Sequence, residues 1–214
     1  MSMQLDYYFD LVCPWCWIGL RQLQQARQRL RASHPQLALE VNWVSYALLP
    51  HLPREGVPYQ EFYLRRLGGA DALAHRRAQI QMAGQGIVPP FAFERIQTMP
   101  NTVLAHRMLD LARAQQADMP ALLEDLYAAW FTQGRDIGDA GVLCELAAPH
   151  LPDSAALAAW LADDAAWAAA QRAALTPRYD ITGVPALTMP GRAPLGGVTS
   201  VDYLHHWLAQ AAIA

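Results

Sequence analysis

The spacing of apolar residues changes twice within the first part of the chain, and each spacing predicts a different element. Residues 4–9 contain no Gly or Pro and are rich in aromatic side chains, which is typical of a strand buried on both faces. Residues 17–32 repeat apolar positions every three or four residues, which predicts a helix that ends at His34, before a proline. Residues 37–44 alternate and predict a second strand. Strand, helix and strand in this order form a βαβ unit, so the two strands should be parallel.

A long run of helical patterns follows. Residues 46–58 are expected to form a proline-rich loop, and between residue 59 and about residue 178 every periodic segment is helical. A break is expected at Gly68-Gly69, and helix starts are expected at Gly138-Asp139, Asp153-Ser154 and Asp163-Asp164. The expected helices are residues 59–83 (with that break), 101–117, 120–132, 140–148, 155–162 and 165–175.

Strand patterns return near the end of the chain. Residues 186–189 and 193–198 flank the turn Pro190-Gly191-Arg192, which predicts a hairpin. Thr199 or Ser200 is then the expected cap of a last helix, residues 201–212.

The order of these elements predicts an α/β fold in which the two ends of the chain share one sheet. The sheet-bearing domain is then discontinuous, with residues 1–50 and 179–214. Residues 51–178 form an inserted all-helical domain, because a helical block of this length usually needs its own core.

Composition and charge narrow the classes of function. The 214 residues are 53% hydrophobic, enough for a core without disulfides, and the net charge of −3 argues against a nucleic-acid partner. No apolar run approaches the roughly 20 residues of a membrane span. The first residues lack the basic start and apolar core of a secretion signal, so we expect a cytoplasmic protein. Three cysteines cannot form a disulfide framework, and a disulfide here is expected to be a reacting one.

The candidate chemistry lies in Cys13-Pro14-Trp15-Cys16, between the first expected strand and its helix. In a βαβ pattern, two cysteines so spaced at a helix start indicate a thioredoxin-like redox motif. A thiolate is the nucleophile in disulfide exchange, and the first turn of a helix stabilises an anion through unpaired N–H groups and the positive end of its dipole. Pro14 suits the first helical position, where a missing N–H costs nothing. We expect a solvent-accessible Cys13 to attack and Cys16 to resolve the mixed disulfide. Pro14 and Trp15 are expected to bind substrate, and Trp17 is expected either to join Trp15 in an apolar rim or to pack in the core.

A zinc half-site or two inert thiols are the alternatives for this pair. A zinc site needs a second pair of ligands, and neither Cys144 with His150 nor the adjacent His205-His206 has a suitable spacing. We therefore expect no metal and no tightly bound cofactor. Cys144 itself is expected to be a small buried side chain, because its neighbours are apolar.

The segment Gly183-Val184-Pro185 leads directly into an expected strand, although proline cannot donate to a sheet ladder. A cis Val184–Pro185 bond would leave the preceding backbone free to pair with an incoming extended chain. Only about 5–6% of X–Pro bonds are cis, so position alone favours an ordinary trans turn. The cysteine pair reverses this preference, because thiol exchange needs a backbone surface that aligns the substrate. We expect Val184 and Pro185 to bind substrate, with the bond cis.

These motifs, taken in order, resemble the DsbA family of thioredoxin-fold proteins and in particular its FrnE-like branch. The resemblance implies a thioredoxin fold interrupted by a helical domain, with Cys13 attacking, Cys16 resolving and Pro185 cis. It also suggests that Asn101, His106 and Arg107 face the cleft over Cys13. The alternative is that Asn101 caps a helix start and that His106 and Arg107 form structural hydrogen bonds. The matching blocks are residues 8–19, Met99-Pro100-Asn101-Thr102, Ala105-His106-Arg107, residues 134–139 and Gly183-Val184-Pro185.

The expected function is thiol–disulfide exchange on protein or small-molecule thiols, catalysed as a protein-disulfide oxidoreductase, with glutathione as a candidate reductant or co-substrate. The same superfamily holds 2-hydroxychromene-2-carboxylate isomerases and kappa-class glutathione transferases. Those enzymes typically carry serine where this chain has Cys13, so the intact pair favours exchange. A polyketide-tailoring enzyme and a non-catalytic binding module are further alternatives. The helical insertion leaves room for a homodimer face.

Overall fold

The computed structural model describes residues 2–151, 153–154, 156–176 and 181–211. The chain divides into two compact units, Met1–Tyr46 with Arg178–Ala214, and Ala47–Pro177. The first, which we call the sheet unit, carries a four-stranded sheet. The second, the helical unit, carries most of the helices and one short strand pair. Whether the helical unit folds as an independent domain stays a prediction.

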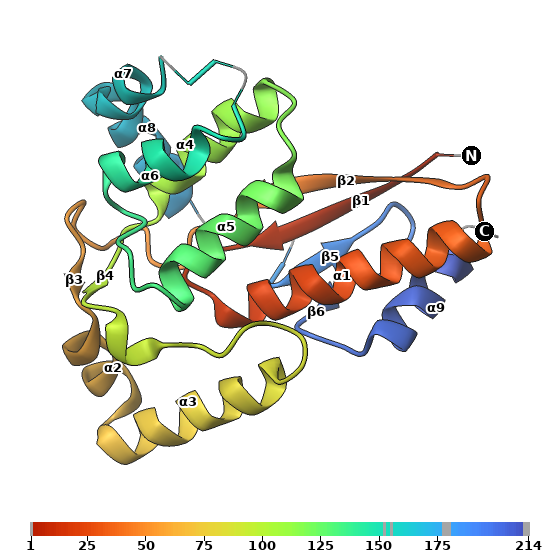
Figure 1. Ribbon diagram of the computed structural model, residues 1–214, viewed down its shortest axis with the longest axis horizontal. Helices are drawn as coiled ribbons and strands as arrows, with labels where there is room; N and C mark the ends of the chain where they lie inside the picture. Colours follow the sequence, from red (N-terminus) through yellow and green to blue (C-terminus); the bar gives the residue numbers. More distant parts are fainter. Residues whose placement is uncertain (1, 152, 155, 177–180, 212–214) are drawn as a thin grey trace. The chain divides into compact units, whose positions relative to one another are not determined.

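The sheet unit is built around β1 (Ser2–Phe9), which lies between β2 (Ala38–Ser45) and β5 (Ala186–Thr188). β1 and β2 pair in parallel along their whole length and are joined by α1 (Pro14–Ser33), which confirms the βαβ prediction. β5 pairs antiparallel with β1 and with β6 (Leu195–Gly196), which confirms the hairpin and the single sheet shared by both ends of the chain. α9 (Val201–Ala211) lies alongside α1 (Figure 1).

Burial along β1 is uneven. Leu5, Tyr7 and Phe9 share one face and are buried, as alternation in a strand requires. The other face is exposed at Ser2 and Gln4 and buried at Tyr8. The expectation of burial on both faces is therefore correct only for the end of the strand that leads into α1.

The ends of these helices follow local chemistry. His34 ends α1, and its backbone N–H donates to the Leu30 carbonyl, as expected for a residue that precedes proline. Ser200, one of the two expected caps of α9, accepts a hydrogen bond from the N–H of Tyr203 through its hydroxyl. The expected helix end at residue 212 lies outside the described residues.

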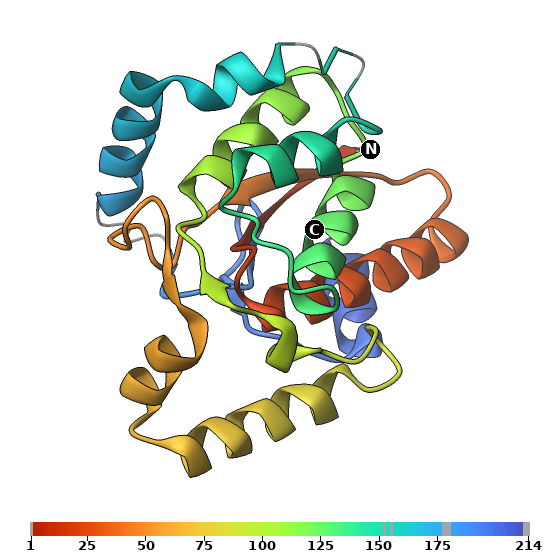
Figure 2. The same cartoon turned by 60° about the vertical axis from the view of Figure 1, so that its left-hand side comes forward.

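The helical unit begins with α2 (Tyr59–Leu67) and α3 (Ala70–Gly84). They are separate helices because Gly68 and Gly69, between them, have φ values of +85° and +142°. The remaining helices are α4 (Val103–Ala114), α5 (Met119–Phe131), α6 (Ala140–Ala147), α7 (Leu157–Ala162) and α8 (Asp164–Leu175), and a 3-10 turn, η1, lies at Phe93–Arg95. Within the unit, α4 contacts each of the helices that follow it (Figure 2).

Aspartate caps fix several helix starts in this unit. Asp139 accepts a hydrogen bond from the Val142 N–H and Asp163 accepts one from the Ala166 N–H, as expected for α6 and α8. The start expected at Asp153-Ser154 is wrong, because α7 begins at Leu157. The side chain of Gln115 bonds both the N–H and the carbonyl of Asp153, so that backbone is held outside the helix.

One short strand pair contradicts the expectation of only loop and helix in this unit. β3 (Val57–Pro58) pairs antiparallel with β4 (Thr98–Met99). Two-residue strands are too short to show alternation, which is why the sequence pattern did not predict them. Gly56 leads into β3 at φ +76°, and a Cβ there would lie 2.6 Å from the Met99 carbonyl oxygen.

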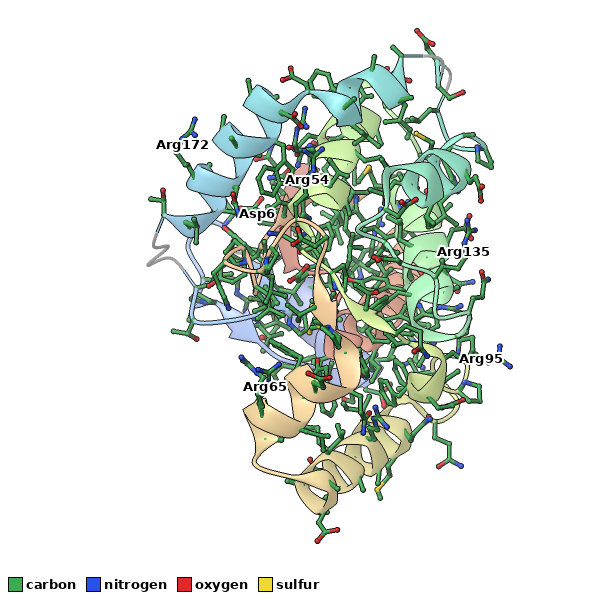
Figure 3. The ribbon with its side chains drawn as sticks, turned by 90° about the vertical axis from the view of Figure 1, so that its left-hand side faces the viewer. Asp6, Arg54, Arg65, Arg95, Arg135 and Arg172 are labelled. Atoms are coloured by element: carbon green, nitrogen blue, oxygen red, sulfur yellow. The ribbon has the colours of Figure 1, made fainter. Side chains whose placement is uncertain are left out.

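Arg54 joins the proline-rich loop to α8 (Figure 3). Its guanidinium forms an ion pair with Asp164 and lies 5.2 Å from the ring centroid of Trp167. The loop is therefore fastened to the helical unit to which it belongs.

Gly134 and Gly86 form a matched pair for testing this unit. Both adopt positive φ, +70° and +74°, but a Cβ at residue 134 would lie 2.4 Å from the Arg95 carbonyl oxygen, whereas residue 86 has no heavy atom within 4 Å. We expect Gly86→Ala to lower the free energy of unfolding by about 1 kcal/mol, through backbone strain alone. Gly134→Ala should cost about 3 kcal/mol, because a steric clash is added. Urea unfolding followed by circular dichroism measures both, and equal losses would contradict the structure.

Candidate active site

The turn between β1 and α1 brings Cys13 to the start of the helix. Asp10 is fully buried, its Oδ1 accepts a hydrogen bond from the Leu11 N–H at 2.7 Å, and its carbonyl accepts one from the Cys13 N–H at 3.2 Å. Cys13 is the extended N-cap residue, and Pro14 is the first helical residue, as expected. The Cys13 sulfur is thus carried at the amino end of a 20-residue helix, where an anion is stabilised.

Cys13 lies beside the segment before β5, within the sheet unit. Its Sγ is 3.7 Å from the Val184 carbonyl oxygen, a contact in which a protonated thiol can donate. The Val184–Pro185 peptide bond is cis, which confirms the prediction. The expectation of an open thiol is wrong, since Cys13 exposes only 4% of its surface, while Pro14 and Trp15 are half-buried. The structure therefore brings Cys13 next to Val184 and Pro185, although this pair lies far from Cys13 in the sequence.

Cys16 is a fully buried free thiol next to Cys13. Burial raises the pKa of the Cys16 thiol well above its usual value, and a hydrogen bond to Cys13 together with the charge of Cys13 raises it further. The Asp10 carboxylate acts in the same direction, and a hydrogen bond from the Asp10 backbone opposes it. Cys16 therefore stays protonated at neutral pH.

Tyr7 belongs to this site and was missed by the sequence reasoning. Its side chain is 1% exposed, and its hydroxyl donates to the Cys16 carbonyl at 2.7 Å. Burial raises the pKa of Tyr7 well above its usual value, and the neighbouring Cys16 and Cys13 add to the effect, so the phenol stays neutral. The available signal was a hydroxyl on the apolar face that Tyr7 shares with Leu5 and Phe9, since a buried phenol needs a hydrogen-bond partner.

Asn101, one of the candidates from the helical unit, has hydrogen-bond partners within that unit. The Asn101 side-chain amide donates to the Pro50 and Leu52 carbonyls at 3.3 and 2.7 Å, and its oxygen accepts from the Val103 N–H at 3.0 Å. Asn101 therefore anchors the approach to α4. His106 is buried in α4. Because Asn101 and His106 belong to the helical unit, a role for them at the thiols stays a prediction.

Three other residues singled out in the sequence have clear positions. Trp17 is completely buried, so it belongs to the core and not to a substrate rim. Arg107 donates to the carbonyls at the end of α7, at Trp160 and Asp163. Cys144 is partly exposed, which corrects the expectation that it is buried, because α6 buries Leu143 and Ala147 instead. Partial burial and the charge of Asp139 raise the pKa of Cys144.

Across the parts of the chain that the structure describes, no three His, Cys, Asp or Glu side chains gather in a way that could hold a metal ion. Within the same described residues, no helix combines the length and apolar character needed to span a bilayer.

A parallel βαβ unit followed by an antiparallel hairpin, with two thiols at the start of its first helix, defines a thioredoxin-like protein. The DSBA-like thioredoxin domain matches residues 4–209, and the chain belongs to that family. No curated protein is significantly similar to it in sequence.

Three solved structures illustrate which proteins share this fold. A probable DsbA oxidoreductase from Streptomyces coelicolor is 26% identical, with a TM-score of 0.80 over 98% of this chain and 89% of its own. The cytosolic disulfide reductase DsbM from Pseudomonas aeruginosa, solved with glutathione, is 20% identical, with a TM-score of 0.62 over 99% of this chain and all of its own. A 2-hydroxychromene-2-carboxylate isomerase is 16% identical, with a TM-score of 0.58 over 99% of this chain and 94% of its own. The last two likenesses show the fold alone.

The raised pKa of Cys16 predicts that the reduced protein loses stability in alkali. Above the usual thiol pKa of about 8.5, the unfolded chain releases the Cys16 proton while the folded chain keeps it. The contribution is thus complete below about pH 8.5, and the free energy of unfolding should then fall by up to about 1.4 kcal/mol per pH unit. Urea unfolding between pH 7 and 10, with a phosphine reductant, measures this slope.

The Cys16→Ala variant should have a shallower alkaline slope than the wild type. Cys144→Ala is the matched control, and its slope should change less because Cys144 is partly exposed. A Cys16→Ala slope equal to that of the wild type would show that burial does not hold the Cys16 proton.

Proposed function

We propose that this protein is a thiol–disulfide oxidoreductase in which Cys13 attacks and Cys16 resolves. The observation that carries the proposal is the pairing of two unlike thiols at one helix start. Cys13 caps the amino end of α1 beside the Val184 carbonyl, whereas Cys16 lies one turn further along the helix, has no exposed surface and has a raised pKa. This difference separates a nucleophile from a resolving thiol.

The reaction proposed for the reduced protein balances in two steps. The Cys13 thiolate attacks one sulfur of a substrate disulfide, a new S–S bond forms, and the other substrate sulfur leaves with the electron pair of the broken bond and takes up a proton. Cys16 then loses its proton and attacks the Cys13 sulfur, which releases the second substrate thiol. The substrate disulfide is reduced by two electrons to two thiols, and Cys13 and Cys16 are oxidised to a disulfide. The reverse sequence oxidises a dithiol.

The backbone of the segment before β5 lies beside Cys13 and offers a surface on which a substrate can bind. Val184 directs its carbonyl toward Cys13, and half-buried Pro14 and Trp15 flank the sulfur. An extended polypeptide with a disulfide can hydrogen-bond along residues 183–184 while its sulfur meets Cys13. We propose that these residues bind substrate, protein disulfides being the main class.

Renewed turnover needs an external thiol. Two molecules of a low-molecular-weight thiol such as glutathione reduce the Cys13–Cys16 disulfide and leave as one oxidised dimer, which conserves the two electrons. The likeness to a cytosolic disulfide reductase solved with glutathione supports both this reductant and a cytoplasmic setting. No tightly bound cofactor is needed.

A Cys16→Ser variant should trap its substrate. With the resolving thiol removed, the mixed disulfide between Cys13 and a protein substrate such as insulin should accumulate, seen by mass spectrometry as an adduct that a reductant removes. Cys13→Ser should form no adduct and should slow glutathione-driven insulin reduction by at least about 100-fold, because the nucleophile is missing.

Cys144→Ser is the matched control for the cysteine variants, since it removes a thiol from the helical unit, and it should reduce insulin at the wild-type rate. A Cys16→Ser protein that reduces insulin at the full rate and forms no adduct would refute the proposed resolving role of Cys16.

A further inference from the structure

Three elements of the sheet unit meet at Gly19, one turn beyond Cys16 in α1. A Cβ at residue 19 would lie 2.9 Å from the Tyr7 hydroxyl oxygen of β1 and 3.3 Å from Cγ of Pro185, which precedes β5. Only a residue without a side chain lets these groups approach so closely. The contact therefore joins the central strand, the helix that carries the thiols, and the segment that faces Cys13.

The Tyr7 hydroxyl is held rigidly at this contact. Its ring packs edge-on against Trp43 of β2, with centroids 5.6 Å apart, and stacks with Phe9 at 6.1 Å. The side chain is 1% exposed, and its hydroxyl donates to the Cys16 carbonyl at 2.7 Å. The hydrogen bond thus ties the first turn of α1 to the centre of the sheet.

The same contact determines how the thiols face the substrate surface. Pro185 lies so close to Gly19 that a Cβ there would be 3.3 Å from its Cγ, and the residue before it, Val184, directs its carbonyl at the Cys13 sulfur from 3.7 Å. A shift of the first turn of α1 relative to Tyr7 would therefore change the distance between Cys13 and Val184.

We propose that Tyr7 is a positioning residue that sets the Cys13 sulfur against the Val184–Pro185 segment for extended polypeptide substrates. It acts through its hydrogen bond to Cys16 and its packing against Gly19, and it does not touch the reacting sulfur of the substrate. This inference rests on the proposed exchange reaction and adds the residue that positions the thiol for polypeptide substrates. The side chain matters when a substrate must reach the sulfur and pair with the 184–185 backbone at once.

Substrate size therefore separates positioning from general damage to the thiol pair. A small disulfide such as bis(2-hydroxyethyl) disulfide needs only the Cys13 sulfur. A peptide with a disulfide in an extended segment also needs the backbone of Val184 at the right distance. Loss of the Tyr7 hydroxyl should slow the second substrate and spare the first.

The test compares wild type and Tyr7→Phe with both disulfides under one reductant. We expect kcat/KM for the peptide to fall about fivefold, the worth of one ordinary hydrogen bond, mainly through a higher KM. The rate with the small disulfide should change less than about twofold. Tyr127→Phe is the matched control, because Tyr127 is also completely buried but lies in α5 of the helical unit, and both of its rates should stay at wild-type values.

Gly19→Ala approaches the same contact from the helix and should give the same selective loss, with both variants checked for native circular dichroism at the assay temperature. Equal slowing of both substrates by Tyr7→Phe would overturn the inference, because the hydroxyl would then act on thiol reactivity. No slowing of either substrate would overturn it as well. A wild-type protein inactive with both disulfides would instead refute the proposed function itself.

Discussion

The first turn of α1 imposes the constraint on which the site depends. The first turn of a helix exposes the positive end of the helix dipole, so the residue that caps it sits in a field that favours negative charge. Here that residue is Cys13, and Pro14 follows with no N–H of its own. The Cys13 N–H donates to the Asp10 carbonyl, and this hydrogen bond closes the turn between β1 and α1. The turn places the Cys13 sulfur at the amino end of the helix. Pairing of β1 with its neighbours keeps the turn in place.

The two thiols differ because the same helix start gives them different surroundings. Cys13 lies at the end of the helix, while Cys16 lies one turn inward and has no exposed surface. Burial raises the pKa of the Cys16 thiol, and the charge of the neighbouring Cys13 raises it further. Tyr7 lies on the buried side of the two thiols and stays neutral, so its hydroxyl donates an uncharged hydrogen bond to the Cys16 carbonyl.

Much of this arrangement was predictable, because it is written in local patterns. The period changes over residues 4–44 predict β1, α1 and β2, and the turn at Pro190-Gly191-Arg192 predicts the hairpin that follows. The cis bond before Pro185 was predicted from the combination of a proline at a strand start with a thiol pair elsewhere. Aspartate caps predicted the starts of α6 and α8.

What could not be predicted depends on contacts between distant residues. The β3–β4 pair is too short to show any periodicity. The start expected for α7 at Asp153 is wrong because the side chain of Gln115, which is distant in sequence, bonds the Asp153 backbone. The burial of Cys13 and the exposure of Cys144 reflect how neighbouring elements pack, which no spacing reveals. Tyr7 and Gly19 become partners only once β1, α1 and the Pro185 segment are folded together.

The separation of Cys13 from Val184 along the chain has a consequence for biosynthesis. These residues are 171 positions apart, yet they touch in the sheet unit. On the ribosome, the thiols emerge before β5, β6 and α9, so the nascent chain carries Cys13 and Cys16 before their surroundings exist. Such non-local pairing slows folding, since the entropy of closing a long loop is lost before the paired strands stabilise the chain. The surroundings of Cys13 are therefore complete only after β5 has been translated and has paired with β1.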